Sequence, residues 1–152
     1  MPFDPIRAVR SSTDLARAHS LACRLAENAY DDRTGRILRA ALITEYARPF
    51  TPRGDASSAL QLGDLIDVPS PVDENTHLLL IDGARMLSQA VSEGENMPWE
   101  ERVPLLDHLD LTTVRDLIFR LRRGLTLKLF PAAGDDPQLL EQLIGPAGSA
   151  QS

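Results

Sequence analysis

The fold is decided by residues 12–30, STDLARAHSLACRLAENAY, in which apolar side chains recur every three or four positions. This spacing places them on one face of a helix, where they form a stripe that can pack against a neighbouring helix. Three further stretches, 34–48, 76–92 and 111–130, repeat the pattern. No alternating run of β-branched residues indicates a strand. The sequence therefore predicts an all-α protein, an up-and-down helical bundle of four main helices.

Proline, glycine and capping residues divide the rest of the chain. Residues 50–71 carry several prolines and glycines, which predicts a long ordered connection that packs on the core and holds one short helix from Asp55. Asp136 before Pro137 predicts the start of a short C-terminal helix, with its body over 138–144. We expect residues 1–11 to form an N-terminal arm, 12–145 a single helical-bundle domain and 146–152 a disordered tail.

The third helix has an unusual apolar pattern. From Leu78 to Val91, apolar residues occupy nearly the whole circumference rather than a single stripe. A helix that is hydrophobic all round is usually buried. We therefore expect this helix to be the most buried element of the bundle, with a cap at Asn75 or Thr76.

Composition narrows the classes of function. The chain has 152 residues and a formal net charge of -6, so its overall field does not attract nucleic acid or anionic lipid. Its lone cysteine, Cys23, cannot form an intramolecular disulfide, which suits a reducing compartment. The N-terminus has no signal-peptide pattern, and no apolar run is long enough to span a membrane. We therefore expect a cytoplasmic protein that does not bind membranes.

Motifs for metal and nucleophilic catalysis are missing from the sequence. His19 and Cys23 lie four residues apart on one helix, but two ligands do not make a zinc site, and neither CxxC nor HExxH occurs. We expect a half-buried cysteine beside a surface histidine, with no metal and no cofactor. The nucleophile elbow of hydrolases and the glycine-rich phosphate loop do not occur either.

The last long helix carries a cluster of basic residues. They lie among leucines and could form a face that contacts RNA phosphates or a protein partner. A solvated outer face is the alternative, since basic residues near a helix C-terminus also interact favourably with the helix dipole. The cluster consists of Arg115, Arg120, Arg122, Arg123 and Lys128.

One pair of strings resembles a known family. Tyr46-Ala47-Arg48-Pro49-Phe50-Thr51 ends a predicted helix, and a long connection then leads to His77-Leu78-Leu79-Leu80. This order, over residues 34–130, resembles small bacterial proteins with the HEPN-like helical-bundle fold. The resemblance implies a relative of metal-independent ribonucleases or of their inactive members, which are often dimeric and tied to toxin–antitoxin or phage-defence functions.

The resemblance also identifies a degenerate site. Arg85 matches the family arginine, Ala90 the alanine that often precedes the catalytic histidine, and Ser92-Glu93 the serine–acid pair that often follows it. Val91 stands where the histidine would be, and valine has no ionisable atom with which to move a proton. Arg85 could instead be an ordinary helix residue whose stem covers apolar neighbours while its head reaches water.

These observations lead to one expected function and two alternatives. We expect a non-catalytic HEPN-like binding or interaction module that forms a homodimer and binds a protein partner, with RNA binding weak at most. The first alternative is a metal-independent ribonuclease with a composite active site, using Arg85 with His77 or His108. The second is a structural orphan domain without a ligand.

Overall fold

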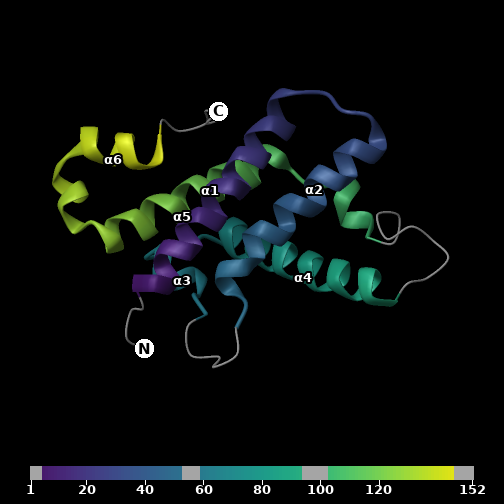
Figure 1. Ribbon diagram of the computed structural model, residues 1–152, viewed down its shortest axis with the longest axis horizontal. Coiled ribbons are helices and arrows are strands. Elements are labelled where there is room, and N and C mark those ends of the chain that lie inside the picture. Colours follow the sequence, from purple (N-terminus) through teal and green to yellow (C-terminus); the bar gives the residue numbers. More distant parts are fainter. Residues whose placement is uncertain (1–4, 53–58, 94–102, 146–152) are drawn as a thin grey trace.

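The computed structural model describes residues 5–52, 59–93 and 103–145, and within these ranges the chain is helical and has no strand. This confirms the all-α prediction. Figure 1 shows the helices along the chain. They are α1 (Pro5–Glu27), α2 (Asp32–Ala47), α3 (Leu62–Leu65), α4 (Pro71–Glu93), α5 (Leu111–Leu129) and α6 (Pro137–Ile144), with short 3-10 turns η1 (Arg48–Phe50), η3 (Pro104–Asp107) and η4 (Pro131–Asp135).

Several helix boundaries follow directly from capping chemistry. The Asp110 carboxylate accepts a hydrogen bond from the Thr113 amide and starts α5. Asp136 accepts from the Leu139 amide, and the expected proline follows it at the start of α6. Such side-chain caps satisfy amide groups that have no partner within the helix. The starts predicted for these two helices are confirmed.

The first helix starts earlier than predicted, because α1 begins at Pro5 rather than at residue 12 and includes the described part of the predicted arm. Arg7 explains the longer helix. Its guanidinium Nη2 donates to the carbonyl oxygens of Arg48, Pro49 and Thr51 at 3.0, 3.1 and 2.7 Å. These carbonyls lie where α2 gives way to η1, and a cation interacts favourably with the carbonyl end of a helix. The carbonyls of Arg48 and Pro49 also accept the amides of Thr51 and Leu60. The first turns of α1 are thus attached to the end of α2.

The start of α4 also differs from the prediction. Asn75 and Thr76 lie inside the helix, which begins at Pro71. The cap is formed by Ser70, whose hydroxyl accepts from the Asp73 amide at 3.1 Å, while the Asp73 carboxylate accepts from the Ser70 amide at 3.0 Å. This reciprocal arrangement satisfies two amides at once.

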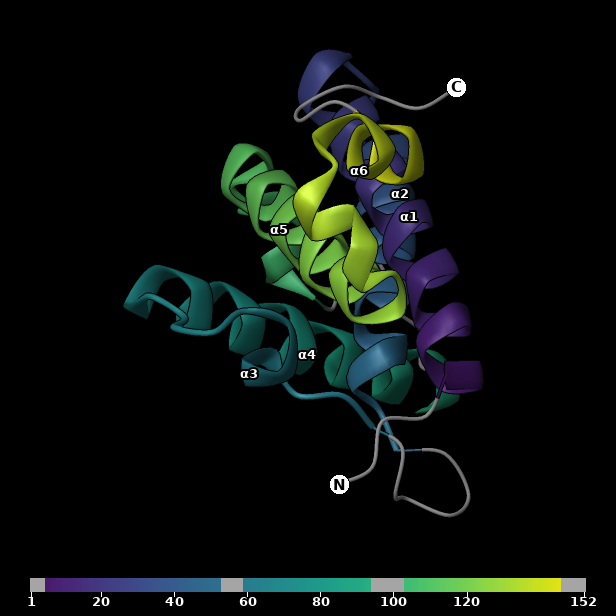
Figure 2. The ribbon, with the colours of Figure 1, turned by 90° about the vertical axis from the view of Figure 1, so that its left-hand side faces the viewer.

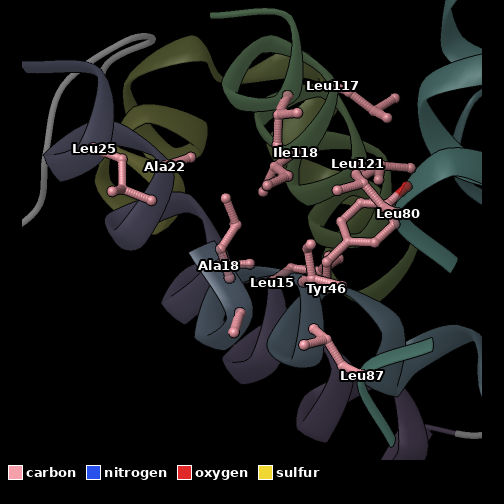
Figure 3. Close-up of a cluster of buried hydrophobic side chains, with 14 of the residues drawn as sticks. Leu15, Ala18, Ala22, Leu25, Tyr46, Leu80, Leu87, Leu117, Ile118 and Leu121 are labelled. Atoms are coloured by element: carbon pink, nitrogen blue, oxygen red, sulfur yellow. The ribbon is translucent and has the colours of Figure 1, made fainter. Parts of the chain in front are cut away.

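Helices α1, α2 and α5 form the centre of the molecule. α1 packs against both α2 and α5, and α1 and α2 form a helical hairpin. α4 packs chiefly on α2, with a smaller contact to α5, so it lies along one edge of the molecule in Figures 1 and 2. Apolar side chains from all four helices meet in one core, shown in Figure 3. They include Leu15, Ala18, Ala22 and Leu25 of α1, Tyr46 of α2, Leu80 and Leu87 of α4, and Leu117, Ile118 and Leu121 of α5.

The expectation that α4 is the most buried helix is wrong. Leu80 and Leu87 enter the core, but Leu78 and Leu79 are 58% and 46% exposed. The reason is the position of α4 at the edge, where one side contacts α2 and no described element covers the outer side. Apolar residues around the whole circumference therefore reflect a second, exposed apolar surface rather than burial on all sides.

The described part of the long connection is ordered on the core. Leu62 and Leu65 of α3 are buried, and the carbonyl of Leu65 approaches α5 at Gly124 so closely that a Cβ there would overlap it. The helix expected from Asp55 begins in residues outside the described part of the chain, as does the whole of the predicted tail, 146–152. None of the described helices is long and apolar enough to cross a membrane.

Candidate functional site

The positions singled out by the family resemblance do not form one polar cluster. The Arg85 side chain is 76% exposed and pairs with Asp82 of the preceding turn, at 3.3 Å between Nη2 and Oδ1. Ala90 is buried, and the Ser92 hydroxyl donates to the Gln89 carbonyl at 3.1 Å. Glu93 is the last residue of α4, and its side chain lies outside the described part. Arg85 therefore reaches solvent, as its alternative interpretation predicts.

Val91 lies in a different environment, on the wall of a cavity of about 630 Å³ between α2 and α4. We call this cavity the α2–α4 groove. Its walls consist mainly of small or apolar residues from the facing sides of the two helices. They include Ile37, Ala40, Ala41, Thr44 and Ala47 from α2, and Ala84, Leu87 and Ser88 from α4.

The polar atoms around the groove are largely satisfied within the chain. The Thr44 hydroxyl donates to the Ala40 carbonyl, and the Thr51 hydroxyl donates to the Ala47 carbonyl, both at 2.8 Å. Two threonines that line the groove thus have their hydroxyl hydrogens committed to backbone carbonyls. Hydroxyls bonded to the backbone in this way compete poorly for a ligand. The groove is therefore a surface suited to apolar contact.

Arg48 is the one cation among the described residues that line the groove. Its Nη1 lies 3.0 Å from a carboxylate oxygen of Glu45 and 3.9 Å from one of Asp14. Two carboxylates neighbour this single guanidinium, so the polar end of the groove does not present an uncompensated positive charge. An anionic ligand such as RNA phosphate would find little attraction there.

The two strings that carry the family resemblance meet in space. The Tyr46 hydroxyl lies 2.7 Å from Nδ1 of His77, and the Phe50 ring packs edge-on against the imidazole with 4.6 Å between centroids. Burial lowers the pKa of His77, because the charged imidazolium loses hydration there. Near neutral pH this histidine is an uncharged packing residue, held by a hydrogen bond to a buried hydroxyl.

An ion pair lies beside the aromatic cluster. Arg120 binds buried Asp73 through both carboxylate oxygens, at 2.6 and 2.9 Å, and also pairs with Asp116. The hydrogen bonds from Arg120 are the main reason that the pKa of Asp73 falls to about 2. Burial is the main cause of the raised pKa of Tyr46, and the negative charge of Asp73 raises it further. This ion pair fastens α5 to the first turn of α4.

The predicted basic face of α5 divides into separate environments. Arg115 lies 4.0 Å from Glu27, Arg120 is committed to Asp73, and Arg122 turns inward. Arg123 and Lys128 are exposed and line a second cavity, of about 390 Å³, together with Asp64 and Asp67. The five cations therefore do not form one continuous stripe, and carboxylates pair with two of them, Arg115 and Arg120.

His19 and Cys23 differ from the expected surface histidine and half-buried cysteine, because both are fully buried. Arg122 Nη1 lies 3.0 Å from His19 Nδ1, and since arginine can only donate, Nδ1 must accept. The imidazole proton is then on Nε2, which lies 3.7 Å from the Cys23 sulfur. Burial raises the pKa of this thiol. No cluster of three or more metal-ligating side chains occurs among the described residues.

Comparisons with known proteins add no assignment. No family model matches the chain, and neither does any curated protein or solved structure.

Proposed function

We propose that this chain is a non-catalytic interaction module that binds an amphipathic helix of a partner protein in the α2–α4 groove. One observation carries the proposal. Val91, which takes the place of the catalytic histidine in the family resemblance, forms part of an apolar wall together with Ala84 and Leu87. The site that would cut RNA in an active relative is, in this chain, a surface for apolar contact.

The dimensions of the groove favour a helical ligand. On α2 its lining residues run from Ile37 to Ala47, which is nearly three helical turns, or roughly 15 Å. On α4 they run from Ala84 to Val91, about two turns. Small side chains on facing helices allow a third helix to approach closely, and the apolar face of an amphipathic helix is a common occupant of such grooves.

The net charge of the chain favours a basic partner. At a formal charge of -6, the module attracts a helix whose outer face carries lysine or arginine. Such charges increase the association rate, while the apolar contacts in the groove supply the affinity. The HEPN-like resemblance adds a biological setting to the proposal, in toxin–antitoxin or phage-defence functions.

The alternative of a composite ribonuclease has less support from the geometry. Of the two histidines considered for it, His77 is bonded to Tyr46 and packed on Phe50. His108 is exposed at the end of η3, where Arg36 pairs with the neighbouring Asp107 at 2.9 Å. A structural domain without a ligand would bind no helix in the groove. A titration with helical peptides therefore distinguishes this alternative from the proposed module.

The proposal is tested by titrating the isotope-labelled protein with two amphipathic helical peptides of about 16 residues, a length that exceeds three turns. Both carry the same leucine–alanine stripe, and their outer faces are rich in either lysine or glutamate. We expect amide shifts to change at Ala41, Ala84 and Val91, with tighter binding of the lysine-rich peptide.

Two matched variants locate the binding. Ser88→Arg places a long cation in the groove, whereas Ser92→Arg changes an exposed serine one turn further along α4 that does not line the groove. We expect Ser88→Arg to weaken peptide binding at least tenfold and Ser92→Arg to leave it nearly unchanged. Failure of both peptides to shift the groove residues, or equal binding by the two variants, would contradict the proposed function.

A further inference from the structure

Two rows of side chains face each other where α1 and α5 pack side by side (Figure 1). Steps of three or four residues place each row on one face of its helix. Arg122 Nη1 lies 3.0 Å from His19 Nδ1, and the Phe119 ring centroid lies 6.0 Å from that of the imidazole. Further along, Arg115 Nη1 lies 4.0 Å from Glu27 Oε1. We call the two rows the α1–α5 seam, which consists of His19, Cys23 and Glu27 on α1 and Arg115, Phe119 and Arg122 on α5.

Arg122 is a half-buried cation without a carboxylate partner in the described part of the chain. Its one hydrogen bond there joins Nη1 to His19, whose imidazole is uncharged near neutral pH because its pKa is lowered to about 4. Burial lowers the pKa of Arg122 itself. A guanidinium has five N–H donors, and the Nε and Nη2 atoms of Arg122 are not among the buried side-chain atoms that lack a partner. These donors are therefore open to a ligand from solvent.

Arg115 brings a second positive charge to the seam. Its side chain is 24% exposed, and its one ion-pair partner among the described residues is Glu27, at 4.0 Å. Arg115 and Arg122 both lie close enough to His19 to add to the effect of burial in lowering the pKa of that imidazole. Burial raises the pKa of the Cys23 thiol, which keeps it protonated. Near neutral pH the seam therefore holds two cations and one carboxylate, and a half-buried cation without a counter-charge costs free energy.

We propose that the α1–α5 seam binds a small phosphate group between Arg115 and Arg122. The N–H groups of a guanidinium form a planar fork that matches phosphate oxygens. A phosphate group carries about 1.5–2 negative charges near neutral pH and has at least three acceptor oxygens, so one group can offset the excess charge and accept from both arginines. The two residues are seven positions apart, roughly 10.5 Å along the helix axis, and their long side chains can approach one group from two sides.

The arrangement favours a single phosphate group over the backbone of a nucleic acid. A nucleic acid presents one phosphate after another, and proteins bind it through several cations along its length. Beyond the seam, Arg120 is committed to Asp73, and Arg123 lies in the second cavity together with two carboxylates. The formal charge of -6 also repels a polyanion, whereas a small anion responds mainly to the charges within its screening distance. This inference concerns α1 and α5 and does not rest on the proposed peptide-binding function of the α2–α4 groove.

The inference is tested by titrating the isotope-labelled full chain with sodium phosphate near neutral pH, against sodium chloride at equal ionic strength. We expect saturable shifts at the amides of Phe119 and Arg122, with a dissociation constant on the order of 1 mM. The pKa of His19, followed through its imidazole resonances, should rise, because the bound anion offsets the two cations that lower it. A parallel titration with phenyl phosphate identifies the source of the group. Tighter binding of phenyl phosphate assigns the site to a phosphate ester, and weaker binding assigns it to free phosphate.

Three matched variants, each with one arginine of α5 neutralised, locate the binding. Arg122→Gln and Arg115→Gln should each weaken phosphate binding about tenfold or more, because each removes charged hydrogen bonds to the anion. Arg123→Gln removes the same charge from an exposed arginine outside the seam and should leave binding unchanged. Circular dichroism without phosphate checks the fold of each variant, and Arg115→Gln alone decides the matter if Arg122→Gln does not fold. Equal shifts in phosphate and chloride, or equal binding by the seam variants and Arg123→Gln, would overturn the proposed site.

Discussion

The Tyr46 hydroxyl and the His77 imidazole lie 2.7 Å apart although 31 residues separate them in the chain. This contact joins the end of α2 to the first half of α4. It joins two segments far apart in the sequence, since His77 supplies the hydrogen-bond partner of Tyr46. Because α4 is otherwise an edge helix, the pair helps to set its position on α2 and thus the form of the α2–α4 groove.

Removing the hydroxyl should therefore destabilise the fold. We expect Tyr46→Phe to lower the free energy of unfolding by about 1 kcal/mol or somewhat more, because it leaves a half-buried imidazole nitrogen without its partner. Urea denaturation measures the change. Tyr30→Phe, at an exposed tyrosine, should change stability by less than about 0.5 kcal/mol. Equal effects of the two substitutions would show that the buried contact does not stabilise the protein.

The close approach of α3 to α5 leads us to expect different effects from alanine substitutions at two glycines. A Cβ at Gly124 would overlap the backbone carbonyl of Leu65, so Gly124→Ala requires one of the two elements to move. We expect a loss of about 1–3 kcal/mol, the range for overpacking. At Gly63, in α3 itself, a Cβ meets no atom within 4 Å. Gly63→Ala should be neutral or slightly stabilising, since alanine favours helix. The two melting temperatures compare these outcomes directly.

Adjacent leucines of α4 should respond very differently to truncation. Leu80 is fully buried in the core, so Leu80→Ala should cost about 2–5 kcal/mol. Leu79 is 46% exposed, and Leu79→Ala should cost less than about 1 kcal/mol. Chemical denaturation of both variants measures the difference. A larger loss at Leu79 than at Leu80 would contradict the position of α4.

Buried His19 predicts a stability that depends on pH. Burial, together with Arg122 and Arg115, lowers the pKa of His19 from 6.5 to about 4. Between these values the unfolded chain binds a proton that the folded chain does not, so the free energy of unfolding falls as pH decreases from 6.5 to 4. The contribution is fully present above pH 6.5, and we expect about 2–3 kcal/mol to be lost by pH 4.

Urea titrations from pH 7 to 4 measure this slope. His19→Gln should reduce this slope, whatever its effect on stability at pH 7, and we expect the part that remains to come from His77, whose pKa burial also lowers. Asp73, with a pKa lowered to about 2, stabilises the fold above its ordinary value of 3.8 and loses that effect between 3.8 and 2, outside this window. A slope that is the same in the His19 variant and the wild type would exclude His19 as its source.

The parts of the fold that were predicted from sequence are those set by local chemistry. Asp110 and Asp136 act on amides three residues away, so the starts of α5 and α6 could be recognised from the sequence alone. The start of α1 depends on contacts between Arg7 and carbonyls more than 40 positions later in the chain. A local sequence pattern cannot indicate a hydrogen-bond partner so distant in the chain.

The candidate site could be predicted only in part for the same reason. The apolar pattern around α4 is real, but periodicity shows which side chains are apolar and not what covers them, so Leu79 was expected inside and is half exposed. The groove was missed because it needs two helices. A signal was present in Ile37, Ala41 and Thr44, which give α2 an apolar side apart from its core residues. The interpretation of Arg85 as a solvent-exposed helix residue agrees with its position in the structure.

The central claim is that this chain binds a partner helix and does not cleave RNA. An RNA cleavage assay tests it most directly. Purified wild-type protein is incubated with structured RNA in EDTA, alongside Arg85→Ala and Val91→His. We predict intact RNA with the wild type and a folded Val91→His variant, because Val91 is 60% exposed and a histidine there can stay hydrated. RNA cleavage by the wild type that disappears in Arg85→Ala would contradict the account and establish a metal-independent ribonuclease.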